Sequence, residues 1–130
     1  MQTLTRLLHW IPGCLWASFI FYLSHQSSPP GADLGPDFLG HILVYGVLAL
    51  TLLWAVTKAL QKQATLQRVL LVWALAVFYG VLDEMHQSMI PLRDPSFKDL
   101  ISNLVGSGLS LAISIPLLRY LRGKWKWIPE

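Results

Sequence analysis

The sequence predicts an all-α integral membrane protein, a four-helix bundle with its N- and C-termini in the cytoplasm. The 130-residue chain is 54% hydrophobic and only 13% charged, whereas soluble domains carry about 25% charged residues. The apolar residues gather in four stretches, each close to the roughly 17–25 residues that cross a bilayer. Lysine and arginine are concentrated on one side of the resulting topology. We therefore interpret residues 1–130 as one transmembrane domain.

The first predicted helix covers about residues 7–23, with Pro12 and Gly13 near its start. A signal peptide is the alternative, but no small-residue cleavage site follows this stretch. We expect a retained helix. The second predicted helix covers about 38–57 and is apolar along its whole length.

The third predicted helix covers about residues 68–87, and its apolar part ends near Asp83. The fourth covers about 99–118, with Pro116 near its inner end. Buried helices of a soluble protein are the alternative for all four stretches. So short a chain could not hide this much apolar surface in one core, and this favours lipid as its surroundings.

The charged residues are divided unequally between the two sides of this topology. The side with both termini and the middle connection holds eight of the ten lysines and arginines. The other side holds only Arg93 and Lys98, together with six of the seven acidic residues. Cytoplasmic loops of membrane proteins are enriched in lysine and arginine. This predicts a multi-pass protein of the cell membrane. The net charge of +3 is then explained by the topology, and we expect no nucleic-acid partner.

Three polar clusters lie on the predicted extracytoplasmic side. Ionisable side chains at the edge of the hydrocarbon are costly, so each cluster suggests a functional site. In the second cluster, Asp37, His41 and Tyr45 follow one another at four-residue spacing and share a helix face. The candidate residues of all three clusters are Ser24, Gln26, Asp37, His41, Tyr45, Asp83, Glu84, Gln87, Arg93, Asp99 and Asn103.

The chemistry of these residue types suggests acid–base catalysis beside an anion. Asp83 or Glu84 would act as general acid or base with His41 as partner. Arg93 carries the planar guanidinium that suits a phosphate or carboxylate. The residues expected to position a bound headgroup are Ser24, Gln26, Tyr45, Gln87, Asp99 and Asn103.

Two other chemistries are less well supported. Zinc ligands are available in Asp37, His41, Asp83, Glu84 and His86, but HExxH is absent, and Glu84 and His86 are spaced for different faces of a helix. We therefore expect no metal and no cofactor. A serine hydrolase would use Ser24, which adjoins His25, but GxSxG is absent. A structural ion-pair network of Asp83, Glu84, Arg93 and Asp99 is a further alternative.

The polar residues resemble the motifs of the VanZ-like membrane proteins. Residues 21–26 read FxxSxQ, and His41, Tyr45 and Leu48 form HxxxYxxL. Residues 80–87 read GxxDExxQ and are followed by PxR ending at Arg93, and then by Asp99, Asn103 and Gly106. The match covers about residues 19–110 in the order and spacing of that family.

The resemblance implies a role in the bacterial cell envelope. The family takes its name from a protein associated with resistance to teicoplanin, which targets lipid-linked cell-wall precursors, so an influence on teicoplanin susceptibility is one implied role. Our leading hypothesis is recognition, with or without modification, of an amphiphilic envelope lipid such as a polyprenyl-phosphate-linked precursor. The alternatives are a non-enzymatic binding or assembly module and a small proton or solute transporter. A transporter would need a homo-oligomer, for which Gly106 and Gly108 offer a close-packing surface.

Overall fold

A computed structural model describes residues 2–28, 37–59, 64–94 and 96–124. Asp33, Lys62 and Lys126, which entered the charge analysis, lie outside these ranges. The described residues form helices and no strand, which confirms the all-α prediction. The helices are α1 (Gln2–Leu8), α2 (Ile11–Ser24), α3 (Asp37–Ala59), α4 (Leu66–Gln87) and α5 (Phe97–Lys124).

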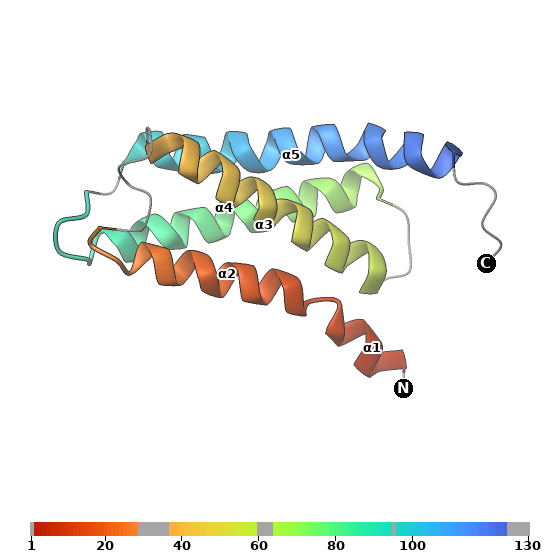
Figure 1. Cartoon of the computed structure of the whole chain (residues 1–130), viewed down its shortest axis with the longest axis horizontal. Coiled ribbons are helices and arrows are strands. Elements are labelled where there is room, and N and C mark those ends of the chain that lie inside the picture. The colour runs from red at the N-terminus through yellow and green to blue at the C-terminus, as the bar shows by residue number, and fades with distance from the viewer. Residues whose placement is uncertain (1, 29–36, 60–63, 95, 125–130) are drawn as a thin grey trace.

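Four segments of the described chain are long and apolar enough to cross a membrane, as a multi-pass membrane protein requires. They are Leu4–Ser24, Asp37–Lys58, Leu66–Gln87 and Phe97–Leu118. Successive long helices run in opposite directions (Figure 1), so α2 and α4 end at the side of the bundle where α3 and α5 begin. The start of α1 and the end of α5 lie at the opposite end of the bundle.

The sequence predicted one continuous helix for the first membrane segment, and the structure instead has two helices there. The segment is interrupted at His9 and Trp10, between α1 and α2. The reason is Pro12, which lacks a backbone N–H and clashes with the carbonyl four residues earlier. Proline is tolerated in the first turn of a helix, and α2 therefore begins at Ile11. α5, in contrast, runs beyond the predicted end and contains Pro116 within it.

The core of the bundle is small, and α3 lies at its centre. α3 packs against α2, α4 and α5 and contributes the buried side chains of Tyr45, Leu48 and Leu53. The outward faces are strongly apolar, with Leu43 69% exposed and Phe78 62% exposed. Exposed apolar side chains along spans of this length fit a lipid environment.

α3 and α5 approach each other backbone to backbone at Gly106. A Cβ atom on Gly106 would overlap the backbone carbonyl of Ile42 and lie 2.6 Å from its Cα. Gly46 on α3 faces Ser110 and the carbonyl of Gly106. Small residues of this kind allow membrane helices to pack backbone to backbone. Gly106 is thus used inside the chain, which removes it from the surface suggested for oligomer formation.

Candidate functional site

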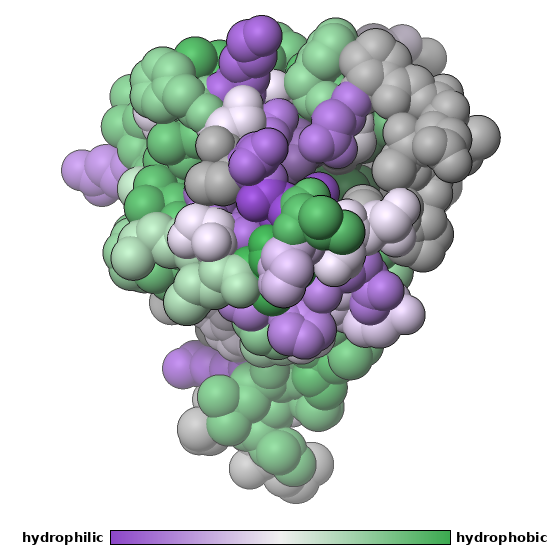
Figure 2. Space-filling view, turned by 90° about the vertical axis from the view of Figure 1, so that its left-hand side faces the viewer, coloured by the Kyte–Doolittle hydropathy of each residue, from purple (hydrophilic) through white to green (hydrophobic). Residues whose placement is uncertain are grey.

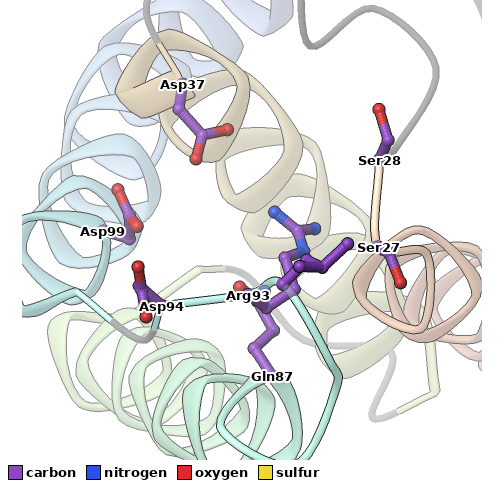
Figure 3. A pocket seen from close by; sticks show the side chains of 8 residues that line it. Ser27, Ser28, Asp37, Gln87, Arg93, Asp94 and Asp99 are labelled. Carbon is purple, nitrogen blue, oxygen red and sulfur yellow. The ribbon is translucent and has the colours of Figure 1, made fainter.

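A polar cavity opens at the end of the bundle where α2 and α4 end and α3 and α5 begin. Its volume is about 350 Å³. Figure 2 shows that hydrophilic residues gather on this end of the molecule, within a more apolar surround. The cavity is lined by Ser27, Ser28, Asp37, Gln87, Leu92, Arg93, Asp94 and Asp99 (Figure 3).

Arg93 is positioned by a tight turn that follows α4. The N–H of Arg93 donates to the Ile90 carbonyl at 3.2 Å, and Leu92 has a positive φ of 66°. Proline at position 91 followed by a positive φ is typical of a type II turn, in which glycine is preferred where Leu92 stands. The leucine costs conformational energy there, and its side chain is 92% exposed.

The guanidinium of Arg93 is partly engaged by the end of α2. Nε donates to the Gln26 carbonyl at 3.1 Å, and Nη2 donates to the Leu23 carbonyl at 3.4 Å. Both carbonyls stand at the C-terminal end of α2, where the Leu23 carbonyl also accepts the Gln26 N–H at 3.1 Å. A guanidinium has five N–H donors, so three remain, and the group extends into the cavity (Figure 3).

The N-terminus of α5 is capped by Ser96 and is also contacted by Glu84 of α4. The Ser96 hydroxyl accepts a hydrogen bond from the Lys98 N–H at 3.1 Å and caps the helix. In a capping box the acid three residues later, here Asp99, would accept the N–H of the capping serine. Glu84 from α4 accepts that N–H instead, at 3.2 Å through Oε2. The Asp99 carboxylate therefore does not accept the Ser96 N–H, and it lines the cavity.

A buried chain of hydrogen bonds joins α2, α3 and α4 beneath the cavity. Asp83 Oδ2 accepts from the Tyr45 hydroxyl at 3.0 Å and from Gln87 Nε2 at 3.2 Å. Gln87 Nε2 also donates to the Ser24 hydroxyl at 3.2 Å. All four side chains are at most 5% exposed. Hydrogen-bonded partners make such burial of polar groups tolerable and fix the rotation of each helix.

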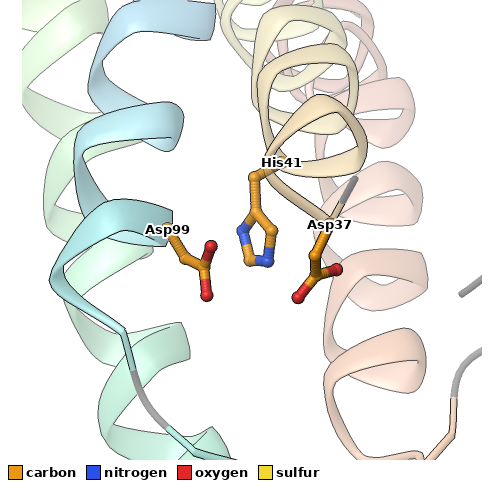
Figure 4. Close-up of side chains that lie close together, drawn as sticks. All are labelled: Asp37, His41 and Asp99. Carbon is orange, nitrogen blue, oxygen red and sulfur yellow. The ribbon is translucent and has the colours of Figure 1, made fainter. Parts of the chain in front are cut away.

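A second buried contact joins α3 to α5. His41 Nδ1 lies 2.9 Å from Asn103 Oδ1, and Asn103 is fully buried. His41 also lies between Asp37 and Asp99 (Figure 4), and one ligand atom from each of these three residues falls within 4.8 Å of the others. One nitrogen of Asn103, Nδ2, and one oxygen of Glu84, Oε1, are buried without a hydrogen-bond partner.

The residues singled out from the sequence gather at one end of the bundle, but they have different surroundings. Arg93, Gln87 and Asp99 reach the cavity. Others lie beneath it, and Asp83 in particular has its Oδ2 occupied by two donors. The side chain of Gln26 turns back to the Tyr22 carbonyl at 3.5 Å and does not line the cavity.

The ion-pair network considered from the sequence is replaced by hydrogen bonds. In the described part of the chain no lysine or arginine forms an ion pair with Asp83, Glu84 or Asp99. Arg93 acts on Asp99 only through longer-range electrostatics. Arg93 donates instead to two backbone carbonyls, and such partners cannot be identified from sequence patterns.

Ser27, Ser28, Leu92 and Asp94 line the cavity but were not among the site residues predicted from the sequence, and Asp37 was named there as a candidate without a role in binding the headgroup. Asp37 and Asp94 carry carboxylates at the cavity, beside Asp99. For Asp37, the four-residue spacing from His41 was the sequence feature that indicated a place in the site. Asp94 had only its position next to Arg93. The cavity thus combines three carboxylates with one guanidinium.

Comparison of the chain with protein-family models, curated proteins and solved structures gives no match. The resemblance to VanZ-like proteins accordingly rests on the motif residues themselves. The fold itself shows that the described residues are all-helical and include four segments able to span a membrane.

Proposed function

We propose that this chain is a VanZ-like protein of the bacterial cell membrane that binds the headgroup of an anionic, amphiphilic envelope lipid. A polyprenyl-phosphate-linked cell-wall precursor is the leading candidate class. The observation that carries the proposal is the polar cavity of about 350 Å³, which opens where the four apolar spans end and into which Arg93 projects.

The position of the cavity relative to the apolar spans supports a lipid ligand in preference to a free solute. The lining residues stand at the ends of the apolar spans, where headgroups lie in a bilayer. Exposed apolar side chains adjoin the lining in the sequence, including Met89, 72% exposed, and Phe97, 75% exposed. A headgroup could occupy the cavity while its hydrocarbon tail remains in the membrane beside these side chains.

Arg93 supplies the recognition of the anion. Its three remaining N–H donors can form charge-assisted hydrogen bonds to phosphate oxygens, which are about twice as strong as neutral ones. Ser27 and Ser28 line the same cavity and offer hydroxyls to sugar or phosphate oxygens. The buried network around Asp83 holds the helices that carry these groups, so binding is better supported than catalysis by Asp83.

The distribution of lysine and arginine supports an extracytoplasmic position for the cavity. At that position the protein would meet lipid-linked precursors on the outer leaflet. A change in teicoplanin susceptibility on deletion of the chain is the corresponding expectation from the VanZ-like resemblance.

Native mass spectrometry of gently extracted protein tests this function. We expect the wild type to carry a phospholipid or polyprenyl phosphate. Arg93→Ala should weaken the affinity for the lipid about 10- to 100-fold, since a hydrogen bond to a charged group contributes about 1.5–3 kcal/mol. Lys98→Ala is the matched control, because Lys98 is the other cation of this side but does not line the cavity.

Arg93→Ala also removes two bonds to α2, so a second variant blocks the cavity without touching them. Ser28 is exposed at the cavity rim, and Ser28→Trp should fold normally and lose the lipid. Wild-type lipid occupancy in both Arg93→Ala and Ser28→Trp would contradict the proposed function.

A further inference from the structure

The side chains of Asp37, His41 and Asp99 converge at the wall of the cavity. One ligand atom from each lies within 4.8 Å of the other two (Figure 4). Two ligand atoms of one zinc ion are separated by at most twice the metal–ligand distance of about 2.0–2.2 Å, or about 4.0–4.4 Å. The three atoms therefore have a spacing that one ion can span with little movement of the side chains.

The hydrogen bond between His41 and Asn103 leaves His41 Nε2 available to a metal ion. Asn103 Oδ1 is a carbonyl oxygen and can only accept, so the proton of the neutral ring lies on Nδ1, 2.9 Å away. The lone pair is then on Nε2. Histidine ligands of metal ions almost always donate their other N–H in this way, and the bond fixes both ring orientation and tautomer.

Glu84 provides an independent indication of a cation. Its side chain is only 9% exposed, and Oε1 is buried without a hydrogen-bond partner. Glu84 lies within electrostatic range of both His41 and Asp99. A buried carboxylate oxygen without a donor or a cation is strongly unfavourable. Because Glu84 accepts the Ser96 N–H through Oε2, it also keeps Asp99 available to the cluster.

The charges at this point are unbalanced. Asp37, Glu84 and Asp99 bring three carboxylates together, and no lysine or arginine forms an ion pair with any of them among the described residues. A bare phosphate entering the cavity would meet this negative charge at close range. A divalent ion would balance the carboxylates and reverse the sign of the field that a phosphate experiences.

We propose that Asp37, His41 and Asp99 bind a divalent transition-metal ion, Mn²⁺ or Zn²⁺, with Glu84 beside them. One imidazole and two carboxylates suit these ions, whereas Mg²⁺ and Ca²⁺ prefer oxygen ligands alone. The proposal replaces the expectation of no metal, which rested on the absence of HExxH and on the spacing of Glu84 and His86 and did not include Asp99 among the ligands.

The ion would also complete the headgroup site, and this consequence rests on the proposed function. Asp37 and Asp99 line the cavity together with Arg93. Three protein ligands would leave further coordination positions for a group bound in the cavity. Phosphate oxygens of the lipid headgroup would then bind the ion on one side and the Arg93 guanidinium on the other.

Metal titration of the tag-free, chelator-treated protein in detergent tests the site. Mn²⁺ followed by electron paramagnetic resonance, and Zn²⁺ followed by calorimetry, should each show one ion per chain and a raised unfolding temperature. Asp99→Asn and His41→Ala should weaken binding at least about 100-fold, given that second-shell changes alone cost about 10- to 100-fold. Mg²⁺ should compete poorly.

His86→Ala is the control for adventitious binding, because it removes the exposed contact between His25 Nδ1 and His86 Nε2 at 3.3 Å. Its affinity for the ion should equal that of the wild type. No binding to folded wild type, or binding that His41→Ala leaves unchanged, would overturn the metal site. Arg93→Ala should keep the ion while losing the lipid, so the two proposals fail separately.

Discussion

At the scale of single residues, Asp83 is the junction of the buried polar network. Its Oδ2 accepts hydrogen bonds from Tyr45 on α3 and from Gln87, which continues to Ser24 on α2. Three helices thereby acquire fixed rotations relative to one another. These rotations set which residues reach the cavity above. The polar residues therefore divide into those that shape the site and those that face its contents.

Removal of the Tyr45 hydroxyl should reveal this structural role. Tyr45→Phe leaves the Asp83 carboxyl with one of its two donors at a position 5% exposed. We expect the free energy of unfolding to fall by about 1–3 kcal/mol. Tyr22→Phe is the control, since Tyr22 is 57% exposed, and it should change stability by less than about 0.5 kcal/mol. Equal unfolding curves for the two variants would argue against the network.

At the scale of helices, the fold depends on the close contact of α3 and α5. Gly106 on α5 lies against the backbone of Ile42, one residue after His41. The same contact brings His41 within reach of Asn103 and places Asp37 opposite Asp99. The backbone spacing at Gly106 thus decides whether the cluster at the cavity can form.

A single methyl group at this contact should be strongly destabilising. Gly106→Ala forces α3 and α5 apart, and overpacking of this kind costs about 1–3 kcal/mol or more. Gly40→Ala is the matched control, since a Cβ on Gly40 meets nothing within 4 Å, and alanine favours the helix by up to about 1 kcal/mol. Unfolding in detergent measures both variants. Stability of Gly106→Ala equal to that of Gly40→Ala would contradict the packing described.

The helices themselves were largely predictable, because long apolar stretches have few alternatives in a membrane. The break at His9 and Trp10 was signalled by Pro12, which the sequence analysis noted without ending the helix there. The pairs that build the site were not predictable. His41 and Asn103 are 62 residues apart, and their contact depends on helix rotation. The bond from the Ser96 N–H to Glu84 likewise joins α5 to α4, and no local sequence pattern predicts it.

At the scale of the whole molecule, the two ends of the bundle differ in charge. The cavity end holds Asp37, Asp94 and Asp99, with Arg93 among them (Figure 3). The other end holds Arg6, Lys58 and Arg68 within the described residues. In the proposed orientation the acidic end faces outward and the basic end faces the cytoplasm. The lipid and metal proposals both assign their ligands to the acidic end.

Cysteine labelling in intact bacterial cells tests this central claim most directly. In a Cys14→Ala background, Ser28→Cys places one thiol at the cavity rim, and Lys58→Cys places one at the opposite end. Both positions are exposed. With a membrane-impermeant maleimide, we predict labelling of Ser28→Cys in intact cells, and of Lys58→Cys only after permeabilisation. The reverse pattern would place the cavity in the cytoplasm and contradict the account.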